Sequence, residues 1–169
     1  MHDDVDISGF QELIEDHSSR TGFELPLLLE LYLTQLLTDR LGTTNLVEPP
    51  CLADCYLNLH QGSRYYGLKA YADQCLFFSS MLPEWGDRSQ LTTDYWAAVG
   101  TAHYHAYAHH TGDDRFHQLA IWFEPLQRFL ASMVKQDSGQ DFSDIYACAL
   151  VDAKYSKGLT LSYENPRTI

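Results

Sequence analysis

The chain has 169 residues, a length typical of one domain. Apolar residues make up 45% of it and aromatic residues 13%, which excludes a disordered chain. The formal net charge of -12 at pH 7 argues against a protein that coats nucleic acid or lies on anionic lipid, because both functions need a basic surface.

The amino terminus and the cysteines indicate a reducing compartment. The first residues are acidic, whereas a signal peptide needs a positive region followed by an apolar core. The longest apolar stretch, residues 25–37, is interrupted by Glu30, Thr34 and Gln35, so we expect no membrane span. We therefore expect a cytoplasmic protein whose four cysteines are reduced thiols. Cys51 and Cys55 have the spacing of one helical face, but no further ligands complete a metal site with them.

A 3.6-residue period of apolar positions dominates the chain, and strand patterns are nearly absent. The first predicted helix spans residues 8–19, with Phe10, Leu13, Ile14 and His17 on its inward stripe. The second begins at residue 23 or 24 and ends at residue 41, with Pro26 in its first turn. Leucines surround much of this second helix, which is typical of a central helix packed on several sides. They are Leu27, Leu28, Leu31, Leu33, Leu36, Leu37 and Leu41.

Further helices follow in chain order. A third opens at Pro49 and Pro50 and closes near Gly62, and a fourth covers residues 63–81. A fifth, capped by Thr92 or Thr93, runs to residue 110 before Gly112. A sixth starts after residue 113 or 114 and reaches residue 134, with Pro125 expected to kink or split it. A last helix covers about residues 143–154.

These elements predict an all-α, single-domain bundle of about six or seven helices. The bundle is expected to occupy residues 1–154. Residues 155–169 would form a C-terminal tail that packs on the domain or on a neighbour.

The negative charge is concentrated in the first third of the chain. Residues 1–62 hold eleven acidic residues against Arg20 and Arg40, a net charge of -9. The remaining residues carry only -3. A solvated, solubilising face is the simplest interpretation, and an acidic docking surface for a basic protein is the functional one.

Five of the eight histidines lie between residues 103 and 117. His105 and His109 are one helical turn apart, and two imidazoles at that spacing can chelate one divalent ion. Asp113, Asp114 or His117 would supply a third ligand across the short turn. The candidate metal site therefore comprises His105, His109, Asp113 and His117.

The other interpretation of this segment is that its histidines are ordinary core and surface residues. A helical wheel places His103 and His110 on the face of Trp96 and Val99, where they would bond tyrosine hydroxyls. No His-Glu-x-x-His motif, phosphate-binding loop or nucleophile elbow occurs in the sequence. We therefore expect no cofactor, with a divalent metal as the alternative, and no catalytic residue is identified.

Residues 71–84, followed by residues 94–100, carry a recognisable pattern. It consists of Asp73, Leu76-Phe77 and Pro83, then a polar loop, then Asp94-Tyr95-Trp96 and Gly100. This stretch, within residues 71–108, resembles an uncharacterised group of small all-helical bacterial proteins. The resemblance implies a bacterial, all-helical protein and no catalytic residue.

Three functional hypotheses follow. The first is a helical protein that acts through protein-protein contacts as a homodimer, because tyrosine and tryptophan are abundant and no catalytic constellation is complete. The second is a metal- or haem-dependent helical enzyme that uses the histidines between His103 and His117. The third is an acidic decoy that blocks a basic partner. None of them involves nucleic acid or a membrane as a partner.

Overall fold

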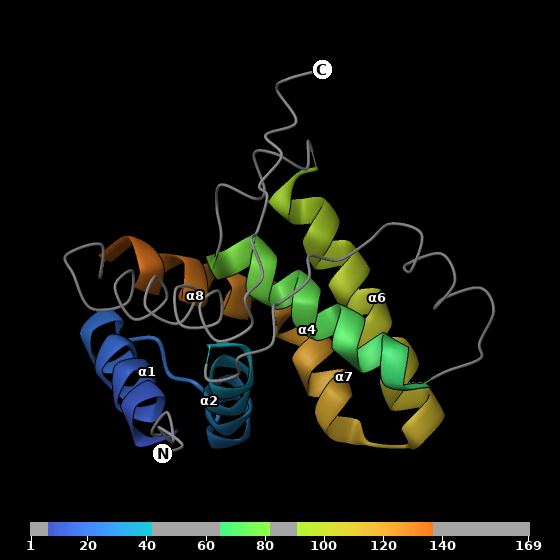
Figure 1. Ribbon diagram of the computed structural model, residues 1–169, viewed down its shortest axis with the longest axis horizontal. Helices are drawn as coiled ribbons and strands as arrows, with labels where there is room; N and C mark the ends of the chain where they lie inside the picture. The colour runs from blue at the N-terminus through green and yellow to red at the C-terminus, as the bar shows by residue number, and fades with distance from the viewer. Residues whose placement is uncertain (1–6, 42–64, 82–90, 137–169) are drawn as a thin grey trace, which may run out of the picture.

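The computed structural model describes residues 7–41, 65–81 and 91–136 (Figure 1). The backbone of these residues forms six α-helices and no strand, which confirms the predicted all-α bundle. The helices are α1 (Ile7–Thr21), α2 (Leu27–Leu41), α4 (Tyr65–Met81), α6 (Thr93–Thr111), α7 (Asp114–Ile121) and α8 (Phe123–Gln136). None of these described helices combines the length and apolar character needed to cross a membrane. The helices predicted at 49–62 and 143–154, Cys51, Cys55, and the tail lie outside the described residues.

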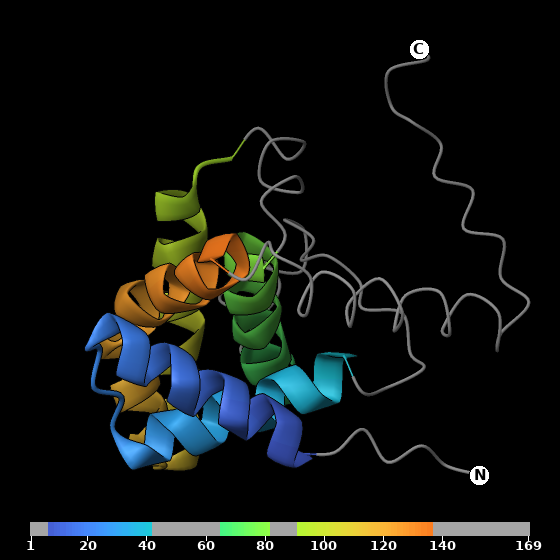
Figure 2. The same cartoon turned by 90° about the vertical axis from the view of Figure 1, so that its left-hand side faces the viewer.

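The helices form two groups that share one core. Helices α4 and α6 pack along each other, α7 packs on α6, and α8 packs on α4 (Figure 1). Helices α1 and α2 run antiparallel on one side of the other four (Figure 2). Buried side chains from all six helices form one continuous hydrophobic cluster. Burial of this cluster is the main force that holds the bundle together.

Side chains of α1 and α2 attach this pair to the other helices. His17 of α1 is buried, its Nε2 lies 2.8 Å from Oγ of Ser132 on α8, and its ring meets Phe129 edge-on. Tyr32 of α2 packs edge-on against Tyr104 of α6 and Phe116 of α7. The inward stripe predicted for the first helix is confirmed, since Phe10 and Ile14 are also buried and Leu13 packs against the core.

Local sequence signals set several helix ends. The side chain of Thr92 accepts a hydrogen bond from the Tyr95 amide, and Gly112 closes α6 in the left-handed conformation at φ 70°. Only a residue without a Cβ adopts that conformation at little cost. The predicted sixth helix is split at Trp122, three residues before Pro125. Pro125 has no N–H to donate to the preceding turn, so a break here costs little backbone hydrogen bonding.

The prediction that the second helix is central and packed on several sides is wrong. Leu29, Leu33, Leu36 and Leu37 are buried, but Leu27, Leu28 and Leu31 are exposed to solvent. The helix also starts at Leu27 rather than at residue 23 or 24, because Pro26 lies just before it and accepts its first hydrogen bonds. Helix α2 thus buries one of its faces and leaves the side that carries Leu27, Leu28 and Leu31 exposed.

Candidate functional site

The histidines of α6 point to different environments. His103 is fully buried, whereas His105, His109 and His110 are exposed. The prediction that His110 lies on the core face is therefore wrong. The buried face of α6 is rotated toward Tyr104 and Ala108, both of which are fully or almost fully buried.

His105 and His117 are brought together across the turn between α6 and α7. Their Nδ1 atoms are 3.0 Å apart, and their ring centroids are 5.3 Å apart. The two nitrogens therefore lie on the facing edges of the rings. Of the four residues predicted as metal ligands, these are the two that the structure places in direct contact.

His109 and Asp113 have other neighbours. The ring of His109 lies 5.9 Å, centroid to centroid, from that of His110. The Asp113 carboxylate accepts hydrogen bonds from the backbone and guanidinium of Arg115, and these hold the pKa of Asp113 below its usual value. Asp113 thereby caps α7 as predicted. Across the described ranges, no group of three or more His, Cys, Asp or Glu side chains is arranged to hold a metal ion.

The ring of His103 is held in one tautomer by a hydrogen bond to the backbone. Its Nδ1 donates to the Val99 carbonyl oxygen at 2.7 Å, and its ring stacks on Tyr71 with centroids 4.4 Å apart. Its Nε2 is buried and has no hydrogen-bond partner in the described residues. Burial lowers the pKa of His103, although the bond to Val99 opposes this shift. The physical cause is that a cationic ring is poorly solvated inside the bundle.

His103 is expected to make the fold sensitive to acid. Because its pKa is lower in the folded state, the unfolded chain binds the proton more readily, so stability is lost as pH falls below about 6.5. Urea unfolding measures this effect. Between pH 7.5 and pH 5, the free energy of unfolding should fall less for His103→Phe than for the wild type. The control His109→Gln, at an exposed position of α6, should follow the wild type. If the free energy of unfolding fell equally with pH in the wild type and in His103→Phe, His103 would not be the cause of the acid sensitivity.

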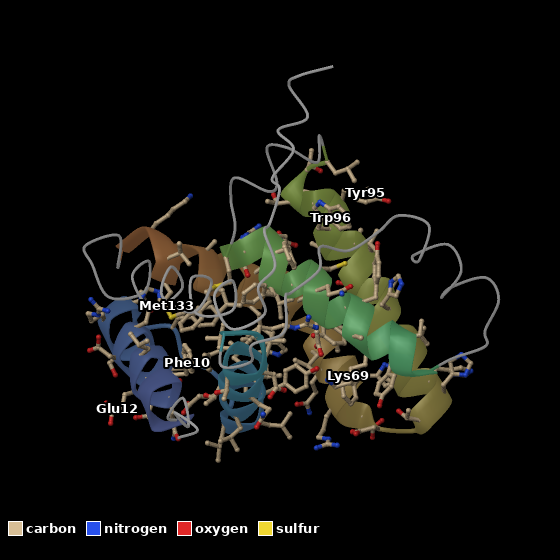
Figure 3. The ribbon with its side chains drawn as sticks, viewed as in Figure 1. Phe10, Glu12, Lys69, Tyr95, Trp96 and Met133 are labelled. Atoms are coloured by element: carbon tan, nitrogen blue, oxygen red, sulfur yellow. The ribbon has the colours of Figure 1, made fainter. Side chains whose placement is uncertain are left out.

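A second group of polar side chains, centred on the buried Asp73, lies where α2, α4 and α6 meet. The carboxylate of Asp73, only 5% exposed, accepts hydrogen bonds at Oδ1 from the hydroxyls of Tyr32 and Tyr104, each at 2.6 Å. Its Oδ2 accepts from Nζ of Lys69 at 2.8 Å. Lys69 extends from α4 (Figure 3). Its ammonium also lies over the Tyr32 ring, 5.4 Å from the ring centroid. We call these four residues the Asp73 network.

The hydrogen bonds of the Asp73 network join helices α2, α4 and α6. Burial, followed by the nearby Asp73 charge, raises the pKa of both Tyr32 and Tyr104 well above the ordinary tyrosine value. Both hydroxyls therefore stay protonated and act as donors. Every oxygen of the carboxylate already has a donor, so the network holds three helices in one arrangement.

Sequence reasoning identified Asp73 as a motif position but not as the centre of a network. A single signal was available: Asp73 is an acidic residue between the buried Ala72 and Cys75 on α4. A carboxylate in such a position needs partners. The partners themselves are 31 and 41 residues away in the sequence, so their identity could not be read locally.

No known protein family, curated protein or solved structure matches the chain. The resemblance of residues 71–108 to a group of helical bacterial proteins therefore stays a prediction.

Proposed function

We propose that the protein acts through protein-protein contacts and that α1 and α2 supply the binding surface. The observation that carries the proposal is a row of exposed leucines on α2. Leu27 is 68% exposed, Leu31 51% and Leu28 37%. These residues are neighbours on one side of the helix, because they are spaced three or four positions apart or adjacent. Exposed apolar side chains gathered in this way are typical of a contact surface.

Acidic side chains border the leucine row. Glu30 follows Leu27 by three positions, and Glu15 of α1 lies against Glu30. Partial burial raises the pKa of Glu30, and the like charge of Glu15 and a hydrogen bond to it raise this pKa further. We call Leu27, Leu28, Leu31, Glu15 and Glu30 the leucine–glutamate face. Glu12 also points outward from α1 into solvent (Figure 3).

The charges favour a basic partner over a second copy. A cationic side chain beside Glu15 and Glu30 would attract both carboxyl groups and offset the repulsion between them. A symmetric pairing of two copies through this face would instead bring four carboxyl groups together. The occupant that fits is an amphipathic helix with apolar residues on one side and lysine or arginine on the other.

A synthetic amphipathic peptide of about 18 residues, with leucines on one face and lysines on the other, tests the proposal. Fluorescence anisotropy should show binding that weakens as salt rises from about 20 to 500 mM, because screening weakens the charge contacts. The double variant Leu27→Ser/Leu31→Ser should bind at least about tenfold more weakly, since it removes the apolar anchors. Glu30→Gln should lower the affinity less and reduce its salt dependence.

The matched control is Ile121→Ser. Ile121 is 70% exposed on α7 and Leu27 is 68% exposed, so replacing Ile121 removes an exposed apolar side chain like that of Leu27 from another helix. This variant should bind the peptide like the wild type. Equal weakening by Ile121→Ser, equal binding of a peptide with glutamates in place of lysines, or no binding would each overturn the proposal.

Sedimentation velocity separates the basic partner from the homodimer predicted from the sequence. The leucine–glutamate face is proposed for a basic partner, so the Leu27→Ser/Leu31→Ser variant should sediment like the wild type. A wild-type dimer that this variant converts to a monomer would assign the face to a second copy and overturn the basic-partner proposal.

A further inference from the structure

The contact between His105 and His117 joins two helices at the molecular surface. His105 is exposed on α6, and His117 is half-buried on α7, twelve residues along the chain. Gly112, in the left-handed conformation, ends α6 between the two histidines, and α7 begins two residues later at Asp114. With Nδ1 atoms 3.0 Å apart, one nitrogen must carry the hydrogen and the other must accept it.

We propose that His105 and His117 form a two-histidine site for a divalent transition-metal ion. Imidazole nitrogens bind zinc at about 2.0–2.1 Å, so two of them on one ion are separated by about 2.9–3.4 Å, depending on the coordination angle. The observed 3.0 Å lies in that range. When the ion binds, the ring that carries its hydrogen on Nδ1 changes to the other neutral tautomer, with the hydrogen on Nε2, so that both Nδ1 lone pairs are free. The ion lies to one side of the line that joins the two nitrogens, and both surface rings turn so that their lone pairs point at it.

The proposed site differs from the one that helical spacing alone suggested. His105 pairs with His117 of the next helix instead of with His109 on its own helix. Asp113 is engaged by Arg115. The described residues supply two ligands, so as far as they reach the site leaves further coordination positions open to water. Such a site favours metals that bind imidazole well, and its affinity for Cu²⁺ should exceed its affinity for Ni²⁺. It should not bind Mg²⁺ or Ca²⁺, which prefer oxygen ligands.

Binding at this position would couple the metal to the α6–α7 corner. An ion held by both helices binds the folded chain in preference to the unfolded one, so it should raise the melting temperature in a concentration-dependent way. Because the site is on α6 and α7, it is independent of the leucine–glutamate face on α1 and α2.

Titration calorimetry of the untagged full chain with CuCl₂, NiCl₂ or ZnCl₂ tests the proposal. The wild type should bind one equivalent of metal at this site. In His105→Gln and in His117→Gln this binding should be lost or become at least about tenfold weaker, because each variant removes one of two chelating nitrogens. The same variants should lose the metal-induced rise in melting temperature. Paramagnetic Ni²⁺ should selectively broaden the ring resonances of His105 and His117.

His109→Gln and His110→Gln are the matched controls, because both residues are exposed on α6 close to His105. They should bind each metal like the wild type. Circular dichroism would verify that all four variants keep their helices. Unchanged binding in His105→Gln and His117→Gln, an equal loss in the controls, or no binding at millimolar metal would overturn the site.

Discussion

Replacing Gly100 with alanine is expected to destabilise the protein by about 1–3 kcal/mol, although alanine normally stabilises the interior of a helix by about 1 kcal/mol relative to glycine. Gly100 is buried in α6. A Cβ at this position would lie 2.2 Å from Cε2 and 2.3 Å from Cζ of Phe123 on α8, and 3.2 Å from Cβ of Cys75 on α4. Carbon atoms in contact normally lie about 3.5–4.0 Å apart, so the Phe123 ring would have to move.

The Phe123 ring has little room to move. Phe123 is fully buried, and its ring packs against Tyr104, with centroids 5.9 Å apart. Because protein cores are closely packed, a displaced ring strains its neighbours. Urea unfolding of Gly100→Ala should therefore show a lower transition midpoint with an unchanged slope.

Two variants control the Gly100 prediction. Gly9 also lies in a helix, α1, but a Cβ there would meet nothing within 4 Å, so Gly9→Ala should stabilise the protein by up to about 1 kcal/mol. Phe123→Leu removes the clashing ring atoms, so Gly100→Ala should cost less in that background. Additive effects of Gly100→Ala and Phe123→Leu would show that the contact with Phe123 is not the cause.

Replacing Asp73 with alanine is expected to cost about 3 kcal/mol of folding stability, because it removes the acceptor of two largely buried hydroxyls at about 1–3 kcal/mol each. Tyr104 is fully buried, so water cannot replace the lost acceptor there. Asp73→Asn keeps a carbonyl oxygen that can accept from both tyrosines and should cost only about 1 kcal/mol. Equilibrium unfolding of the two variants measures the difference.

The residues that donate hydrogen bonds to Asp73 should contribute unequally to the folding stability. The Lys69 side chain is 39% exposed, so water can solvate its ammonium and Lys69→Met should cost at most about 1 kcal/mol. Tyr104→Phe should cost less in the Asp73→Ala background than in the wild type, because the hydroxyl has already lost its acceptor. Equal costs for Asp73→Asn and Asp73→Ala would refute the role of the two hydroxyls.

The two residues with the largest expected effects belong to the motif that carried the resemblance. Asp73 and Gly100 were recognised in the sequence as pattern positions without a physical role. In the structure, Asp73 joins three helices and Gly100 lets α8 approach α6. Both roles concern the packing of the helices.

The sequence pattern does not show which face of a helix is buried where two of its faces carry similar residues. The leucines of α2 surround the helix, so periodicity could not show which of them meet the core. On α6, histidines, tyrosines and alanines alternate around the helix, and the predicted core face was rotated away from Tyr104. In both helices, residues on neighbouring helices determine which side is buried.

The sequence by itself determined the helical class and several helix ends, because these depend on interactions within a few residues. Thr92, Gly112 and Asp113 act on the adjacent turn, and Pro125 acts on the turn before it. Only the tertiary structure decided which side chains meet: Asp73 with its tyrosines, His105 with His117, and Leu27 and Leu31 with solvent. The physical reason is that these contacts depend on how separate helices pack, and packing is a property of the whole chain.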